Sequence, residues 1–117
     1  MRHRSSVRQL GRRRAARKSL LRNLATDLIN KKSVTTTLAK AKSLRVYAEK
    51  LVTIAKTKPA EQAQRLLQGK LFGKQAVKSL VTNYKKAYQN RSGGYLRLTK
   101  LGPRSGDQSK MVKVEWL

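Results

Sequence analysis

The chain has 117 residues, of which 29 are Lys or Arg and 5 are Asp or Glu, so its formal net charge is +24 at pH 7. This length allows one domain with a modest core, and the absence of Cys excludes disulfides and thiolate metal sites. No apolar run reaches the roughly eighteen residues that a membrane span needs. So large a charge opposes compaction unless a polyanion neutralises it, and nucleic-acid phosphate is the polyanion we expect.

The cations are concentrated at the beginning of the chain. Nine Lys or Arg residues precede Asp27, the first acidic residue, and eight of the nine are Arg. Because a guanidinium group grips phosphate through two donors and stacks on bases, this choice favours RNA binding over a merely solvated tail. Residues 1–11 lack apolar periodicity, so we predict a basic arm that is extended or disordered until RNA binds, followed by one globular domain over 12–117.

The arm also has the composition of a mitochondrial presequence, since it is rich in Arg, contains Ser and lacks acids. The Arg pattern continues into the first predicted helix, and cleavage would truncate that helix. We therefore favour a structural arm, and the sequence leaves a bacterial or an organellar host open.

The first predicted helix runs from about Arg13 to Asn30. Cations at every fourth position form one stripe, which comprises Arg14, Lys18 and Arg22. Its apolar residues form a wide core face on another side: Ala16, Leu20, Leu21, Leu24, Ala25, Leu28 and Ile29.

A short β-branched segment, Ser33–Thr37, predicts a strand, and Thr36 or Thr37 can cap a helix from about Leu38 to Lys56. Its early turns contain Lys40, Lys42 and Arg45, where the helix dipole disfavours cations. An external anion would compensate them, although solvated charges remain an alternative. The apolar spacing of this helix alternates between three and four: Ala41, Leu44, Ala48, Leu51 and Ala55.

Two further helices are predicted in the middle of the chain. The first has Pro59 in its first turn, Leu66 and Leu67 facing inward, and Gly69 at its end. The second runs from Lys74 to about Gln89, with an inner face made of Val77, Leu80, Val81, Tyr84 and Tyr88.

Residues 95–101 and 111–117 alternate in polarity and are joined by a turn-rich loop, which predicts an antiparallel hairpin. Its inward positions are Leu96, Leu98, Val112, Val114 and Trp116. The element order is therefore α-β-α-α-α-β-β, an α/β (α+β) fold in two layers with a small sheet covered by helices.

Catalytic chemistry has little support. His3 is the only His, and the five acids are dispersed among separate elements. Gly93 and Gly94 precede a strand rather than a helix, which is the wrong order for a phosphate-binding loop. We predict no enzyme activity, no cofactor and no metal site.

Several ordered motifs resemble the bacterial ribosomal large-subunit protein seventeen family. They are Met1–Arg4, Leu10–Arg12, Leu21–Ala25, Thr36–Lys42 and Asn90–Tyr95, followed by Arg97, Lys100, Arg104 and Gly106–Asp107. These blocks span nearly the whole chain, and residues 57–80 match least well. In that stretch Leu71 and Phe72 agree with the family, whereas Gly73 departs from it.

The resemblance implies the same element order and a structural constituent of the large ribosomal subunit. It further implies binding to the subunit's RNA near the nascent-chain exit on the solvent side, with the N-terminal arm entering the RNA. The protein would be a monomer among neighbouring ribosomal proteins, with no membrane, in a cytoplasmic or an organellar ribosome.

We predict recognition of RNA phosphates, 2′-hydroxyls and shape by three sets of residues. The alternative is a free-standing DNA-compacting or RNA-chaperone protein, which the same charge would permit. The predicted RNA-binding residues are Arg2, His3, Arg4, Arg8, Arg12, Arg13, Arg14, Arg17, Lys18, Arg22, Lys40, Lys42, Arg45, Arg97, Lys100 and Arg104.

Overall fold

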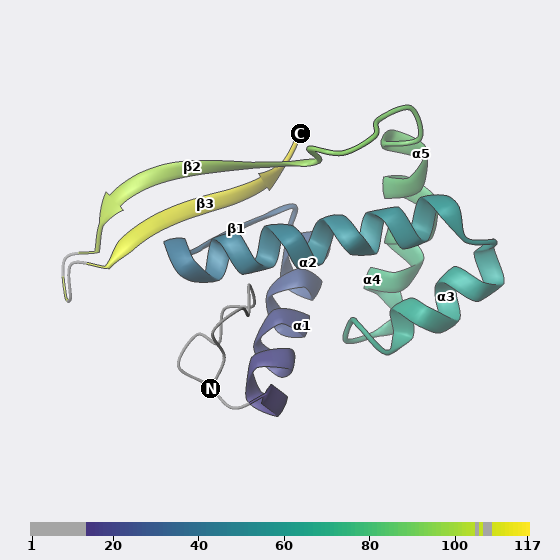
Figure 1. The fold of residues 1–117 in the computed structure, drawn as a ribbon, viewed down its shortest axis with the longest axis horizontal. Coiled ribbons are helices and arrows are strands. Elements are labelled where there is room, and N and C mark those ends of the chain that lie inside the picture. Colours follow the sequence, from purple (N-terminus) through teal and green to yellow (C-terminus); the bar gives the residue numbers. More distant parts are fainter. Residues whose placement is uncertain (1–13, 105, 107–108) are drawn as a thin grey trace, which may run out of the picture.

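The helices and strands follow the predicted order. The computed structural model describes residues 14–104, 106 and 109–117. Over these residues the elements are α1 (Arg14–Lys31), β1 (Ser33–Thr37), α2 (Leu38–Thr57), α3 (Ala60–Gln68), α4 (Lys74–Ser79), η1 (Leu80–Tyr84), α5 (Lys85–Ala87), β2 (Leu96–Pro103) and β3 (Lys110–Trp116) (Figure 1). Because α4, η1 and α5 are continuous, they form the single fourth helix that the sequence predicts.

The three strands form one antiparallel sheet in the order β1-β3-β2, with β3 in the centre. Val114 pairs with Val34 on one side and Leu98 on the other, so these apolar side chains share a face. The helices pack on that face, which confirms the two-layer α+β fold. The predicted hairpin is also confirmed, with a bulge between Lys100 and Gly102 where Gly102 has a φ of 91°.

Helix α2 is the centre of the core. Its predicted spacing is confirmed, because the five apolar residues named above are all buried, together with Val52. The helix packs on β1 and β3 and also contacts α1 and α3. Thr37 is the N-cap residue, as one of the two predicted positions, but its side chain makes no capping hydrogen bond.

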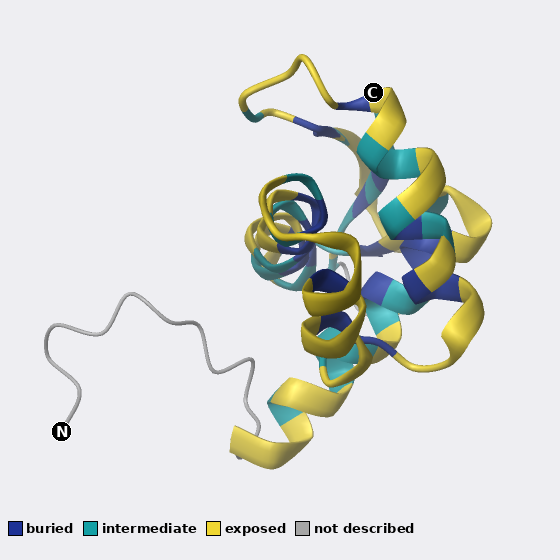
Figure 2. Cartoon of the chain, turned by 90° about the vertical axis from the view of Figure 1, so that its right-hand side faces the viewer, coloured by how far each residue is buried: buried dark blue, intermediate teal, exposed yellow. Residues whose placement is uncertain are grey.

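Helix α1 uses only part of its predicted apolar face. Ala25, Leu28 and Ile29 are buried, whereas Ala16 is exposed. Figure 2 shows the first turns of α1 as mostly exposed. The apolar pattern continues beyond the point where α2, β1 and α4 can cover it, so the first half of the helix projects from the body.

The third helix differs from the prediction in two details. Pro59 is the N-cap of α3 rather than a residue of its first turn. Leu67 is fully buried, whereas Leu66 is 40% exposed. Successive residues on an α-helix lie about 100° apart, so the buried line passes through Ala63 and Leu67 and leaves Leu66 outside.

The fourth helix contains a π-turn, η1, and ends at Ala87, slightly before the predicted end. Its inner residues Leu80, Tyr84 and Tyr88 recur every fourth position, a spacing that drifts around an ideal α-helix of 3.6 residues per turn. The wider turn takes up this drift, so both tyrosines face the core.

Candidate nucleic-acid interface

Six of the predicted RNA-binding residues lie outside the described part of the chain: Arg2, His3, Arg4, Arg8, Arg12 and Arg13. Their role stays a prediction. The structure places the other ten in three groups, on the first half of α1, at the beginning of α2 and in the β2–β3 hairpin.

The α1 group consists of Arg14, Arg17, Lys18 and Arg22. Arg14 and Lys18 are exposed, Arg17 is half-buried, and the first turn of the helix contains no acidic residue. Figure 1 shows this part of α1 as a projection from the helical body. A projecting helix with cations and few neighbours offers a surface that RNA can approach from several directions.

Arg22 has an intramolecular role as well. Its guanidinium group donates a hydrogen bond of 3.1 Å to the carbonyl of Leu71 and lies 4.1 Å from the ring centroid of Phe72. Thr26 accepts a hydrogen bond of 2.9 Å from the amide of Phe72. The loop between α3 and α4 is therefore attached to α1 through Arg22 and Thr26, and less of the Arg22 charge is left for RNA.

The α2 group consists of Lys40, Lys42 and Arg45. Lys42 and Arg45 are exposed and Lys40 is half-buried. The first turn of α2 has no acidic residue, so the positive end of the helix dipole adds to these charges. An anion at this position would satisfy the terminal amides and neutralise the cations, as phosphates do at helix N-termini.

The hairpin group consists of Arg97, Lys100 and Arg104, all exposed. Arg97 pairs in register with Glu115 on the outer face of the sheet, whereas Lys100 pairs with Val112 on the helix-covered face. Lys100 lies on the edge strand of the sheet and remains exposed, whereas its partner Val112 in the central strand is buried. Arg97 and Lys100 therefore point to opposite faces of the hairpin.

The sheet register brings the α2 group to the same end of the sheet as Lys100 and Arg104, whereas Arg97, which pairs with Glu115, lies at the other end. Thr37, directly before α2, pairs with Met111, and Met111 pairs with Gly102. The beginning of α2 therefore lies beside the outer part of the hairpin, although the two are far apart in the sequence. The α1 group does not join them and stays on its own projection (Figure 1).

Two further hairpin cations, Lys110 and Lys113, were not predicted from the sequence. Lys110 is exposed at the start of β3, and Lys113 pairs with Thr99 on the outer face of the sheet. The alternation of β3 carries this signal, because positions 111, 113 and 115 must face away from Val112 and Val114.

Three of the four described acidic residues lie near cations. Asp27 lies 4.0 Å from Lys31, Glu49 lies 4.0 Å from Arg45, and Glu115 lies 3.7 Å from Lys113. Glu49 also accepts a hydrogen bond of 3.0 Å from the amide of Gly94. These pairs are solvent-accessible and each contributes little stability.

Tyrosine is the described residue type with clearly shifted acidity. Burial raises the pKa of Tyr47, and the positive charge of Arg22 partly opposes the increase. Burial likewise raises the pKa of Tyr84 to about 12. Both hydroxyls donate to backbone carbonyls, Tyr47 to Lys70 at 2.6 Å and Tyr84 to Ile29 at 2.7 Å, so they stay protonated and structural.

Among the described residues, no helix combines the length and apolarity that crossing a membrane requires.

The chain is similar to known ribosomal proteins over nearly its whole length. The chain is 44% identical over 116 residues to the large ribosomal subunit protein bL17 of Methylacidiphilum infernorum, covering 99% of this chain and 88% of that protein. It is also 44% identical over 115 residues to the bL17 proteins of Chloroflexus aurantiacus and Chloroflexus aggregans, covering 98% of each chain. The sequence profile of the family described as ribosomal protein L17 matches residues 20–117. The resemblance seen in the sequence is confirmed, and the chain belongs to the ribosomal protein L17 family.

Proposed function

We propose that the protein is a structural constituent of the large ribosomal subunit that binds and stabilises the subunit's RNA. The observation that carries this proposal is the 44% identity to large-subunit proteins over nearly the whole chain. The family consists of structural ribosomal proteins, so the role is not enzymatic. The protein would contact neighbouring ribosomal proteins and lie near the nascent-chain exit. The ribosome would be that of the cytoplasm or of an organelle.

The mechanism rests on neutralising phosphates where RNA segments approach one another. The α2 group, Lys100 and Arg104 form one cationic end of the molecule, and the α1 group forms a second, separate contact. Two such contacts on one rigid core would hold two RNA segments at a fixed distance, which is a scaffold function. Contacts of this kind position RNA by its backbone and shape rather than by base sequence.

The salt dependence of RNA binding tests this mechanism. Each phosphate contact contributes roughly 0.7–0.9 to the slope of log affinity against log salt. Lys42→Ala and Arg45→Ala should each lower the slope of the full chain on large-subunit RNA by roughly that amount. Lys58→Ala is the matched control, because Lys58 is exposed at the opposite end of α2.

Equal slopes for all three variants would contradict the proposed α2 contact. Equal affinity for large-subunit RNA and for an unrelated duplex would instead indicate a general nucleic-acid binder. Removal of residues 1–12 deletes Arg2, Arg4, Arg8 and Arg12, so the slope should fall by roughly three units if all four contact phosphate. An unchanged slope after this truncation would show that the N-terminal cations contact no RNA.

A further inference from the structure

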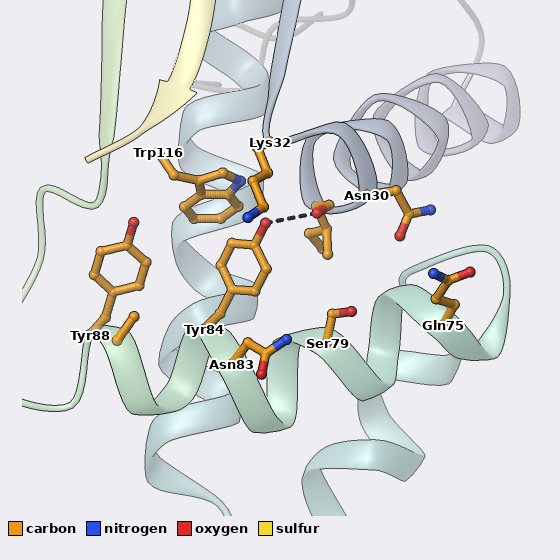
Figure 3. Close-up of a pocket in the computed structure, with 10 residues that line it drawn as sticks. Asn30, Lys32, Gln75, Ser79, Asn83, Tyr84, Tyr88 and Trp116 are labelled. Atoms are coloured by element: carbon orange, nitrogen blue, oxygen red, sulfur yellow. Dashed lines mark hydrogen bonds between the residues drawn. The ribbon is translucent and has the colours of Figure 1, made fainter.

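A pocket lies between the end of α1 and the fourth helix, apart from the three cation groups (Figure 3). Its volume is about 300 Å³, which is the lower end of the range for small-ligand sites. Lys18 and Asn30 are separated by twelve residues of α1, or about 18 Å at the helical rise of 1.5 Å per residue. The pocket is therefore a separate surface and not part of the α1 group.

One wall of the pocket is aromatic. The rings of Tyr84 and Trp116 meet edge to face, with centroids 4.7 Å apart and an interplanar angle of 62°. The Tyr84 hydroxyl donates to the carbonyl of Ile29 at 2.7 Å, and the Trp116 indole donates to the carbonyl of Leu28 at 3.0 Å. Both polar groups are thus already used, and the bonds fix the rings in place, so the wall offers rigid ring surface for stacking.

The rim of the pocket is made of neutral polar groups. Asn30 comes from α1, whereas Gln75, Ser79 and Asn83 follow one another at every fourth position of the fourth helix (Figure 3). Within the described residues, none of the three carboxamides makes a side-chain hydrogen bond, so their donors and acceptors are available. Lys32 is the single charged residue of the lining, which contains no acid.

We propose that this pocket receives one unstacked base of the RNA, an inference that rests on the proposed function. A base has flat faces that stack on aromatic rings and an edge with hydrogen-bond donors and acceptors. A carboxamide presents one acceptor and two donors, and therefore pairs with such an edge. The flanking phosphates would be held by Lys32 at the rim and by two exposed lysines, Lys78 and Lys86, each of which is adjacent in sequence to a lining residue.

The lining fits other ligands less well. A phosphate group would meet a single ammonium and otherwise neutral amides, whereas phosphate sites gather several cations or helix amides. An apolar side chain of a neighbouring protein would leave three carboxamides without partners. The π-turn that places Asn83 and Tyr84 in the lining also agrees with a ligand site, because such turns are frequent at functional positions.

Trp116 makes this proposal testable, because it is the only Trp in the chain. Titrating the full-length protein with fragments of large-subunit RNA should change Trp116 fluorescence in proportion to binding. Gln75→Leu and Asn83→Leu should each weaken RNA binding about tenfold, which corresponds to about 1.4 kcal/mol. Neither variant should change the slope against salt, since neither removes a phosphate contact. Matched controls are Gln64→Leu and Asn23→Leu, which replace exposed residues outside the pocket and should bind as the unmodified protein does.

Three outcomes would overturn the inference, and they are distinguishable. RNA binding with unchanged Trp116 fluorescence, and with pocket variants equal to their controls, would refute the base pocket while the proposed function stands. Absence of any RNA binding would refute the proposed function and the pocket with it. A fluorescence change that requires another large-subunit protein and not RNA would show that the pocket receives protein instead.

Discussion

The indole Nε1 of Trp116 donates a hydrogen bond of 3.0 Å to the backbone carbonyl of Leu28, and so joins the last strand to the end of the first helix. The last four carbonyls of an α-helix have no partner within the helix. The Tyr84 hydroxyl satisfies a second of these carbonyls, that of Ile29. Tyr84 and Trp116, from two distant parts of the sequence, therefore cap the C-terminus of α1 by donating hydrogen bonds to its carbonyls.

Removing either donor should destabilise the fold. Tyr84→Phe keeps the ring and loses only the hydroxyl, and Trp116→Phe keeps an aromatic side chain and loses the indole N–H. Each leaves a helix-terminal carbonyl without its partner, so the free energy of unfolding should fall by about 1–3 kcal/mol. Urea unfolding of each variant against the unmodified protein measures this loss. Unchanged midpoints for both variants would show that water replaces the two donors without cost.

Tyr84 should also make stability fall at high pH. Burial raises the pKa of Tyr84 from its ordinary value of 10.0 to about 12, and Tyr88 adds to the increase. The folded state thus binds this proton more tightly than the unfolded state does. Its stabilising contribution is complete below pH 10 and is lost as the pH rises through about 12. The difference in unfolding midpoint between the unmodified protein and Tyr84→Phe should shrink over that interval. A difference that stays constant would contradict the raised pKa, and Lys titration cancels because both proteins share it.

Arg22 should behave differently from the other cations of α1. Arg22→Ala removes the hydrogen bond to Leu71 and the contact with Phe72, so the free energy of unfolding should fall by about 1–3 kcal/mol. Arg14→Ala removes an exposed side chain and should change stability by less than about 0.5 kcal/mol. Thermal unfolding of the two variants checks this contrast. Equal stability of the two variants would mean that Arg22 does not hold the α3–α4 loop.

The loss of stability caused by a core substitution should increase with the burial of the residue that is replaced. Leu44 is completely buried on α2, so Leu44→Ala should cost roughly 2–5 kcal/mol. Leu24 is only half-buried on α1, and its replacement by Ala should cost clearly less. Chemical denaturation of both variants gives the comparison, with a larger loss for Leu24→Ala as the result that would contradict the observed packing of α1.

The buried residues of α2 could be predicted from the sequence because other elements cover this helix along its whole length. The apolar face of α2 packs against β1, β3, α1 and α3, and the residues that the three-and-four spacing predicts are buried there. The pattern of α1 is equally clear in the sequence, but among the described residues nothing covers Ala16, which is exposed. Periodicity shows which face is apolar and does not show how far the rest of the fold extends to cover it.

The charges of the proposed RNA-binding surface were predictable from the sequence, and their grouping was not. The helix dipole disfavours cations near a helix N-terminus, so the sequence draws attention to Lys40, Lys42 and Arg45. Their proximity to the hairpin depends on the pairing of Thr37 with Met111, which no local pattern contains. The pocket was not predictable for the same reason, since Asn30, Asn83 and Trp116 meet only when the fourth helix packs against the end of α1.

Sedimentation of the tagged full-length protein through a density gradient tests whether the protein is a constituent of the large ribosomal subunit. We expect the protein to migrate with the large ribosomal subunit and to be absent from fractions that contain only the small subunit. It should leave the large subunit as salt is raised, because phosphate contacts weaken with ionic strength. Migration with chromosomal DNA, or with the unassembled soluble fraction at physiological salt, would contradict the proposed function.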